Sequence, residues 1–175
     1  MRKQISVTII TKNEEKNIEA CIRSCKGFDD VLILDCLSHD NTQTKALKAG
    51  GRFLQQKWLG YGPQKNMAAD LAENDWIFSL DADERLSIEF LESLDKNVFE
   101  KESVAYAVKR QSYFLGKKVR FSGWQNDWVV RLYNRNVCTF DSRAVHEKLI
   151  GFSKDIYACE FGVRFKGNRR LGKYG

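Results

Sequence analysis

The chain has 175 residues, of which 43% are hydrophobic and 30% are charged. This length suits one domain with a sizeable core, and the apolar and aromatic content excludes a disordered chain. The 29 lysines and arginines exceed the 23 aspartates and glutamates, and the net charge of +6 favours an anionic partner such as a phosphorylated ligand, an anionic membrane surface or nucleic acid.

The first apolar run, residues 5–10, follows a basic N-terminus but is too short for the core of a signal peptide. No other segment approaches the ~20 apolar residues of a membrane-spanning helix. We therefore expect a cytoplasmic protein, and peripheral contact with a membrane stays open.

The five cysteines indicate core packing rather than a metal or redox site. Cys21 and Cys25, the closest pair, have three residues between them, whereas redox and zinc C-x-x-C motifs have two. Together with Ile18 and Ile22, these two cysteines follow the i, i+3, i+4, i+7 spacing of a buried helix stripe.

The first half of the chain alternates between strand and helix patterns. The predicted strands cover 5–10, 30–35, 52–56 and 76–80, and the predicted helices cover the stretch up to Ala49 and 64–72. An earlier helix is expected after the first strand, because Thr11-x-x-Glu14 fits a capping box. This alternation predicts an α/β fold with a mostly parallel, Rossmann-like sheet flanked by helices.

The pattern changes in the second half. Ser87 is a plausible N-cap for a helix whose apolar set would be Ile88, Leu91, Leu94 and Val98. Three β-like stretches without long helices between them follow, at 104–114, 119–121 and 129–133. We therefore expect added mixed or antiparallel strands.

Polar clusters follow three of the predicted strands, at 11–14, 35–40 and 81–84. In an open parallel sheet, ligands bind beyond the carboxyl ends of the strands, so three such clusters together predict a binding site. The third cluster, Asp81-Ala82-Asp83-Glu84, crowds three carboxylates and needs something to neutralise them. A divalent cation, Mg or Mn, with substrate phosphates would do so. The competing interpretation is a solvated acidic turn that caps the next helix.

Several ordered motifs resemble the inverting glycosyltransferases of family 2, which have the nucleotide-diphospho-sugar-binding fold called GT-A. Those of the first half are SVTIITKNEEKNIEACIRS, DVLILDCLSHDNT, GYGPQKNMAADLA and WIFSLDADERL. In the second half, YFLGKKVRFSGWQNDWVVRLYNRN and FDSRAVHEKL resemble the bacterial lipopolysaccharide-core β-1,4-glucosyltransferases that glucosylate heptose. The resemblance runs from about Ser6 to Leu149.

The resemblance implies roles for the polar residues of the first half. Thr11 and Glu14 would lie near the nucleotide, Asp35 at the base, and Lys65 beside the nucleotide or its phosphates. A carboxylate can accept the imide N–H of uracil, and a lysine can offset diphosphate charge. Without the resemblance, Asp35 is equally well a strand-end turn residue and Lys65 a solvated helix residue.

In the family's acidic motif, the first acid, here Asp81, meets the ribose or the metal, and the last, Asp83, ligates the metal. The matching Val145-His146-Glu147 implies that His146 completes the metal shell and that Glu147 contacts the acceptor or competes as the base. A lone histidine is more often structural.

Transfer with inversion needs a base on the acceptor hydroxyl, and we choose Asp127. Related enzymes carry a Glu-Asp pair in this region, and Asn126 departs from it, so an ordinary turn aspartate is the alternative. Trp124 could stack on an acceptor sugar or be buried in the core. Arg131 could meet phosphate or pair with Asp127.

We thus expect a single GT-A domain that moves glucose from UDP-glucose to a lipid-linked saccharide acceptor of the lipopolysaccharide or lipooligosaccharide core, at the cytoplasmic face of the bacterial inner membrane. Its nucleotide-sugar-binding half would be 1–86 and its acceptor-side half 87–150. Family members continue past the His-Glu pair, so 151–175 is expected as a basic tail of a truncated relative.

Three other functions remain as alternatives. The first is a catalytically impaired, truncated relative that only binds nucleotide sugar. Dispersed basic residues and the lack of a recognition motif argue against nucleic-acid binding. The lack of a glycine-rich turn after the first strand argues against a dinucleotide oxidoreductase.

Overall fold

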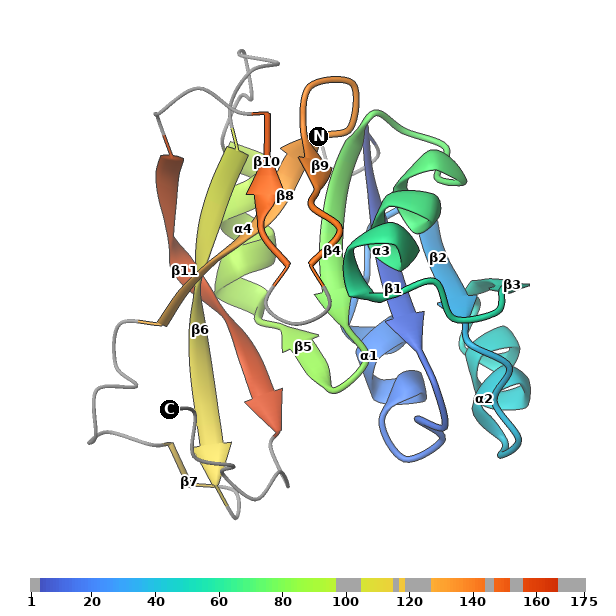
Figure 1. Cartoon of the computed structure of the whole chain (residues 1–175). Helices are drawn as coiled ribbons and strands as arrows, with labels where there is room; N and C mark the ends of the chain where they lie inside the picture. Colours follow the sequence, from blue (N-terminus) through green and yellow to red (C-terminus); the bar gives the residue numbers. More distant parts are fainter. Residues whose placement is uncertain are drawn as a thin grey trace.

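The computed structural model describes residues 4–96, 105–114, 117–118, 127–143, 147–151 and 156–166. These residues form an α/β fold around one large curved sheet (Figure 1). The strand order is β3-β2-β1-β4-β8-β6-β11-β5, and β7 (Lys117–Lys118) pairs with β6 outside this path. A separate pair, β9 (Thr139–Phe140) and β10 (Leu149–Ile150), forms a hairpin.

The first half of the sheet is parallel, as the sequence predicts. It contains β1 (Ile5–Thr11), β2 (Asp30–Asp35), β3 (Arg52–Gln55) and β4 (Trp76–Asp81). β1 lies in the middle, paired with β2 on one side and β4 on the other, and β3 is the edge strand. Four parallel strands place all four carboxyl ends at one edge of the sheet.

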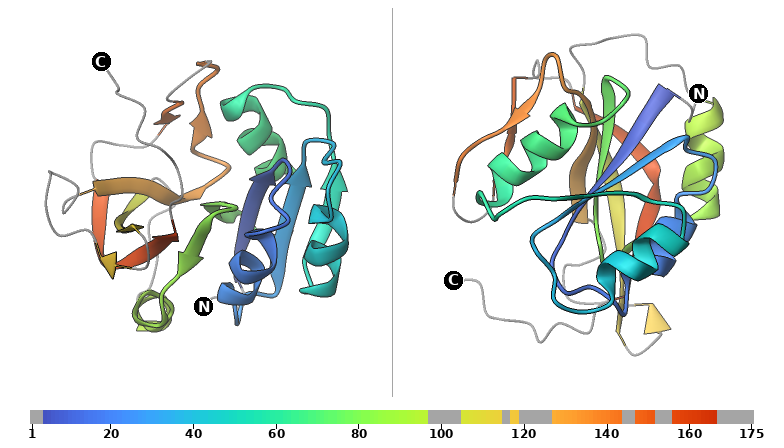
Figure 2. Two further views of the ribbon diagram at one scale, coloured as in Figure 1. Left: turned by 90° about the horizontal axis from the view of Figure 1, so that it is seen from below. Right: turned by 90° about the vertical axis from the view of Figure 1, so that its right-hand side faces the viewer.

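Helices cover both faces of this parallel half. α1 (Ile18–Ser24) and α2 (Thr42–Lys48) lie on one face, and α3 (Tyr61–Asp70) lies on the other together with the β9–β10 hairpin (Figure 2). The stripe of Ile18, Cys21, Ile22 and Cys25 is buried, which confirms core packing for these cysteines. Cys36 and Cys138 are also buried and free.

The predicted capping box is wrong. Thr11 is the last residue of β1, and α1 begins only at Ile18. The intervening residues are held by the loop after β2 instead, since the backbone N–H of Glu14 donates to Thr42 Oγ1 at 2.8 Å and that of Glu15 to Asp40 Oδ2 at 3.1 Å. These tertiary hydrogen bonds satisfy the donors that a local helix turn would have used.

The second half of the sheet is mixed. β8 (Asp127–Asn134) runs antiparallel to β4, and β6 (Ala105–Phe114) runs antiparallel to β8. β11 (Ile156–Lys166) is parallel to β6, and the short β5 (Glu84–Leu86) pairs antiparallel with it. Because only a two-residue turn separates β4 from β5, the sheet curls back on itself between these strands.

β11 was not anticipated. Residues 151–175 were expected as a tail, yet 156–166 form a strand within the main sheet. The segment IYACEFGVRFK carries β-branched and aromatic residues, a composition typical of strands, but its parallel partner β6 lies far back in the sequence.

α4 (Ile88–Lys96) begins as predicted, because the Phe90 backbone N–H donates to Ser87 Oγ at 3.1 Å. Its buried face differs from the prediction. Ile88 is exposed, whereas Phe90 and Leu94 are fully buried. The Phe90 ring packs on Phe78 of β4 with a centroid distance of 5.2 Å, and this contact sets the helix rotation.

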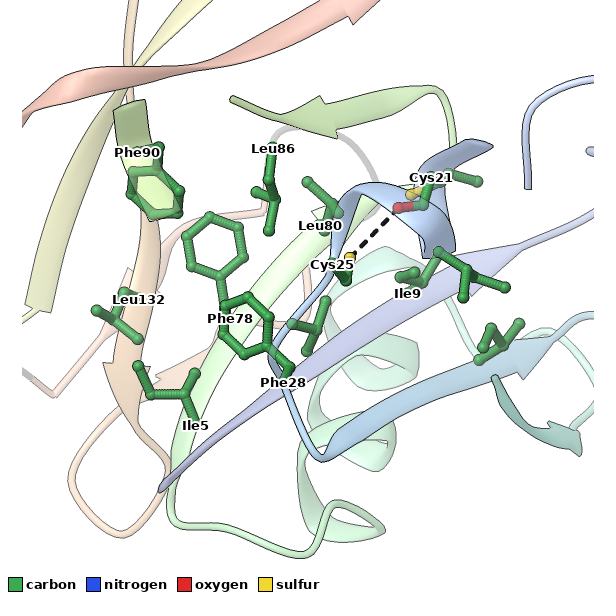
Figure 3. Packing of buried hydrophobic residues seen from close by; sticks show 14 of the residues in the cluster. Ile5, Ile9, Cys21, Cys25, Phe28, Phe78, Leu80, Leu86, Phe90 and Leu132 are labelled. Atoms are coloured by element: carbon green, nitrogen blue, oxygen red, sulfur yellow. Dashed lines mark hydrogen bonds between the residues drawn. The ribbon is translucent and has the colours of Figure 1, made fainter. Parts of the chain in front are cut away.

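The core forms two clusters, one on each face of the sheet. The larger contains Phe78 and Phe90 together with Ile5, Leu86 and Leu132, so it joins both halves of the sheet (Figure 3). The smaller lies under α3 and the hairpin. Within the described part of the chain, none of the helices is long and apolar enough to cross a membrane.

Candidate functional site

The polar residues predicted at the strand ends lie at one edge of the sheet. Thr11 at the end of β1 pairs with Asp35 at the end of β2, and its neighbour Ile10 pairs with Asp81 at the end of β4. Asp35 and Asp81 are therefore two strand spacings apart, about 10 Å. The parallel register alone sets this separation.

Asp35 is fully buried and held by its own loop. Its carboxylate accepts hydrogen bonds from Ser38, through the backbone N–H at 2.8 Å and through the hydroxyl, and from Gln55 Nε2 at 3.3 Å. Ser38 Oγ in turn accepts the backbone N–H of Asn13 at 2.7 Å. The Asp35 carboxylate thus has a fixed orientation at the end of β2.

Thr11 and Glu14 lie beside this loop. The Thr11 carbonyl accepts the Cys36 N–H at 2.7 Å, while its hydroxyl is buried and has no hydrogen-bond partner among the described residues. Glu14 Oε2 accepts Asn17 Nδ2 at 2.8 Å. A buried hydroxyl without a partner is costly in a finished fold and is typical of a binding site.

The loops after β1 and β2 are held together by hydrogen bonds that the sequence did not reveal. Asp40 accepts the Glu15 N–H and the hydroxyl and N–H of Thr42. Burial by itself would raise the pKa of Asp40, but the bonds from Thr42 and Glu15 outweigh it and lower that pKa. The network holds the site in shape without a ligand.

Asp81 lies between two cations. Arg131 Nη2 of β8 is 2.6 Å from Asp81 Oδ2, and Lys65 Nζ of α3 is 3.8 Å from Asp81 Oδ1. Burial by itself would raise the pKa of the Asp81 carboxyl, but Arg131 and then Lys65 outweigh it and hold that pKa well below its usual range. Asp81 is therefore ionised at neutral pH, as a metal ligand must be.

Glu84, the first residue of β5, also pairs with Arg131. Its Oε1 is 2.6 Å from Arg131 Nη2 and 3.7 Å from Arg110 Nη1, and its side chain is fully buried. Burial raises the pKa of Glu84, Asp81 adds to the rise and Arg131 opposes it. The expectation that a cation and a diphosphate neutralise the acidic cluster is thus incomplete, because Arg131 and Arg110 already pair with it.

Arg131 was expected on the acceptor side, to meet phosphate or pair with Asp127, but its side chain is only 5% exposed and pairs with Asp81 and Glu84 instead. Asp127 lies four residues earlier on the same strand, about 13 Å away along an extended backbone. Asp127 pairs in register with Arg110 of β6. Its side chain, Trp124 and His146 lie outside the described residues.

Glu147 reaches the site from the β9–β10 hairpin. Its Oε1 is 2.6 Å from Lys65 Nζ, and the Lys65 ammonium also lies 5.2 Å from the centroid of the Phe140 ring. Sequence reasoning predicted both residues for the site but not their ion pair. The pair brings a residue from near the end of the chain against α3.

The hairpin is clamped onto α3 by two residues that the sequence did not single out. Asn66 donates to the Phe140 carbonyl at 2.9 Å and accepts the Phe140 N–H at 2.8 Å. Gly62 packs so closely that a Cβ there would lie 1.9 Å from the Asp141 carbonyl oxygen. The sequence carries no signal of this contact, because the predicted helix begins at residue 64 and α3 begins at Tyr61.

A divalent cation fits the donors at the end of β4. The Asp81 side chain is 37% exposed, and its Oδ1 lies 3.8 Å from Lys65, whereas its Oδ2 lies 2.6 Å from Arg131. Asp83 is half-buried in the turn that follows. The described residues contain no group of three His, Cys, Asp or Glu side chains able to hold a metal ion. Mg²⁺ and Mn²⁺ commonly use one or two carboxylates and take their other ligands from substrate phosphates and water.

The chain is similar to known glycosyltransferases along most of its length. The family profile described as "Glycosyl transferase family 2" matches residues 6–161. An uncharacterized glycosyltransferase of Rickettsia typhi is 34% identical over 163 residues, which cover 88% of this chain and 55% of the relative. The lipopolysaccharide core biosynthesis glycosyltransferase LpsC of Rhizobium meliloti is 31% identical over 153 residues, which cover 83% of this chain and 57% of LpsC. The chain thus spans a little over half the length of these relatives.

Solved structures share the fold. The structure of Staphylococcus aureus TarS 1-349 matches with a TM-score of 0.68 at 18% identity, over 93% of this chain and 60% of that one. TarS 1-349 in complex with UDP-GlcNAc gives a TM-score of 0.65 at 17% identity, over 97% and 60%. Glucosyl-3-phosphoglycerate synthase of Mycobacterium tuberculosis, in complex with Mn²⁺, UDP and glucosyl-3-phosphoglycerate, gives 0.51 at 23% identity, over 63% and 44%. The fold is therefore GT-A.

Proposed function

The chain belongs to glycosyltransferase family 2, and from this premise we propose that it transfers glucose from UDP-glucose, with inversion, to a heptose of a lipopolysaccharide or lipooligosaccharide core. The observation that carries the proposal is the cluster of Lys65, Asp81, Arg131 and Glu147 at the end of β4, about 10 Å from the buried Asp35. The Asp35 end of the site suits a nucleobase, and the Asp81 end suits a diphosphate.

The donor's base would bind at the end of β2. Asp35 Oδ2 already accepts from the Ser38 N–H and Gln55, but Oδ1 accepts only the Ser38 hydroxyl and keeps a lone pair for the imide N–H of uracil. The buried Thr11 hydroxyl would find its missing partner on the nucleoside. The TarS complex with UDP-GlcNAc supports a uridine nucleotide as the donor carrier.

The diphosphate would bind at the end of β4. Asp81, Asp83 and His146 would hold Mg²⁺ or Mn²⁺, which supplies charge stabilisation to the leaving diphosphate. Lys65 of this chain would add its positive charge to that of the metal ion. Its ammonium is paired with Glu147 at 2.6 Å, and a diphosphate would compete for it. Donor binding would thereby loosen Glu147 from Lys65 on the acceptor side.

Inversion requires a base on the acceptor hydroxyl, opposite the diphosphate. We assign Asp127, at the start of β8, to this role, with Glu147 as its competitor. Trp124 would stack on the acceptor sugar, and Arg131 would contribute to the acceptor side while holding Asp81 and Glu84. Of the two candidate bases, Glu147 has its carboxylate occupied by the Lys65 ammonium at 2.6 Å.

The acceptor assignment is supported by the similarity to LpsC, whose name places it in lipopolysaccharide core biosynthesis. Such acceptors are lipid-linked, so the proposed place of action is the cytoplasmic face of the inner membrane.

A screen of donor hydrolysis and transfer across nucleotide sugars, with and without Mn²⁺, tests the donor and the reaction together. UDP-glucose with a heptose acceptor should give product, and GDP- and CMP-sugars should not. Product from another donor would replace UDP-glucose in the proposal. UDP binding without turnover of any donor would leave only a nucleotide-sugar-binding chain.

Asp83→Asn tests the metal. Calorimetry should show that Mn²⁺ strengthens UDP binding in the parent chain by about tenfold or more, and that the variant loses this gain because a ligand charge is removed at nearly constant shape. Asp75→Asn, an exposed surface aspartate that pairs with Arg135, is the matched control and should keep the gain. Equal UDP affinity with and without metal in the parent would contradict the metal assignment.

A further inference from the structure

Three segments of this chain, 41–69, 104–126 and 161–175, each contain five lysines and arginines and no acidic residue. Residues 41–69 contain Lys45, Lys48, Arg52, Lys57 and Lys65 and no aspartate or glutamate. This segment covers α2, the edge strand β3, the following loop and most of α3. Outside the three segments, acidic residues outnumber basic ones.

Not all of the charges in residues 41–69 reach solvent. Lys65 is buried in the site, and Arg52 pairs with Asp30 at 3.0 Å. Lys45 donates to the Glu15 carbonyl at 2.8 Å. Lys48 and Lys57 are exposed on α2 and on the loop after β3. These two lysines therefore give the surface its charge.

The same segment carries half of the exposed large hydrophobic side chains in the described part of the chain. They are Leu47, Leu54, Trp58, Leu59 and Tyr61. The last three are consecutive apart from a glycine and are 47%, 46% and 45% exposed. Together with Lys57 they form what we call the aromatic loop, residues 57–61.

The aromatic loop has a defined conformation. The Leu59 N–H donates to Gln64 Oε1 at 3.3 Å, and the Trp58 and Tyr61 rings meet edge to face with centroids 4.8 Å apart. Gly60 has a φ of 101°, which other residues rarely adopt. The chain thus holds three large apolar side chains in water, an arrangement that indicates an interaction surface.

The aromatic loop lies at the same edge of the sheet as the donor site. It follows the carboxyl end of β3, the edge strand that pairs with β2 (Figure 2, right). Tyr61 is one helical turn before Lys65 on α3, so the two residues share a face of the helix. A surface that binds this loop would therefore be close to the reacting groups.

We propose that the aromatic loop forms the surface by which this chain binds an anionic lipid bilayer. Trp58, Leu59 and Tyr61 enter the headgroup region, and Lys57 pairs with anionic lipid phosphates. The purpose of this contact rests on the proposed function, because a lipid-linked acceptor has to reach the donor site from the membrane. The contact itself can be measured without any transfer reaction.

The chemistry favours a bilayer over a protein or a free sugar. Tryptophan and tyrosine combine an apolar ring with a polar group and are enriched at membrane interfaces. Leu59 adds apolar area without a polar group, which a bilayer accepts and a sugar does not require. The long segment without acidic residues complements an anionic headgroup layer.

Sedimentation of the full chain with vesicles tests the proposal. Vesicles of phosphatidylglycerol and phosphatidylethanolamine should bind the chain at low salt, and raising the salt to about 0.5 M should reduce binding several-fold because charges are screened. Phosphatidylcholine vesicles should bind it at least about tenfold more weakly. Absence of binding at low salt, or equal binding to both lipids, would overturn the proposal.

Two pairs of variants locate the surface. Trp58→Ser with Leu59→Ser should lower vesicle binding about tenfold or more, whereas Ile88→Ser with Leu71→Ser, which also removes two exposed apolar side chains, should not. Lys57→Glu should lower it far more than Lys16→Glu, which changes the net charge equally. Equal losses within either pair would contradict the assignment. A thermal unfolding transition within a few degrees of the parent establishes that each variant is folded.

Two further measurements separate the alternatives. If the chain self-associates in analytical ultracentrifugation and the Trp58/Leu59 variant abolishes this while leaving vesicle binding intact, the loop is a contact between copies and the proposal is wrong. UDP binding is measured on the same variants and should be unchanged. Vesicle binding without donor turnover would support the membrane surface and contradict the proposed function. Donor turnover without vesicle binding would support the proposed function and contradict the membrane surface.

Discussion

The parallel and antiparallel halves of the sheet build the site in different ways. In β1, β2 and β4 the site residues stand at strand ends, and the register places Asp35 and Asp81 without help from any other part of the chain. The antiparallel half supplies Arg131 from the middle of β8 and Glu147 from a hairpin. The first half thus provides the two strand-end carboxylates and Lys65, and the later part of the chain provides Arg131 and Glu147, which pair with Asp81 and Lys65.

This difference places the critical seam between β4 and β8. Asp81 belongs to β4 of the first half, while Glu84, Arg131 and Arg110 belong to strands of the second. The donor site is expected to keep its shape only while the seam is intact. Substitutions on either side of the seam therefore distinguish what each half of the sheet contributes to the site.

The largest expected effect concerns the base. Asp127→Asn should lower turnover about 100-fold to 10,000-fold and leave UDP affinity nearly unchanged, because a base acts on the acceptor and not on the nucleotide. Steady-state kinetics and calorimetry on the same preparation measure both. Glu147→Gln is the comparison, and if it loses turnover while Asp127→Asn keeps it, the base is Glu147.

Breaking the seam should be the next largest effect. Arg131→Met leaves Asp81 and Glu84 without their shared arginine and should lower the free energy of unfolding by about 3–5 kcal/mol. Arg23→Met removes an exposed i, i+4 pair with Glu19 and should cost under about 0.5 kcal/mol. Urea unfolding of both variants provides the comparison, and similar costs would show that the seam carries no special energy.

A smaller effect is expected where the hairpin meets α3. Gly62→Ala places a methyl group against the Asp141 carbonyl and should cost about 1–3 kcal/mol while moving Glu147 away from Lys65. Gly50→Ala is the control, since its Cβ meets nothing within 4 Å and its cost comes from a φ of +89°. Thermal unfolding gives the stabilities. Only Gly62→Ala should also change transfer kinetics, and an unchanged rate would mean that the hairpin does not position Glu147.

The smallest effect tests the connection that follows β5. Ser87→Ala removes the hydroxyl that accepts the Phe90 N–H and should cost about 1 kcal/mol. Ser93→Ala, on the same helix and similarly buried, removes a hydroxyl that donates to the Phe90 carbonyl and should cost roughly half of that or less. Denaturant midpoints decide between them, and the reverse order would rule out Ser87 as the helix cap.

The alternation of strands and helices up to residue 81 was predictable, since the residue pattern of each element lies within a short stretch of the sequence. The buried cysteine stripe, the N-cap at Ser87 and the acidic cluster after β4 were readable for the same reason. The ordered motifs also indicated the glycosyltransferase family. All these features depend on spacing along the chain, which the sequence displays directly.

What the tertiary structure decided involves partners far apart in the sequence. Arg131 lies 50 residues from Asp81, and Glu147 lies 82 from Lys65. The start of α1 moved to Ile18 because hydrogen bonds from the loop after β2 replaced a local cap. Strand pairing brings such residues together, and charge and hydrogen bonding then act across a few ångströms of space, which no spacing along the chain records.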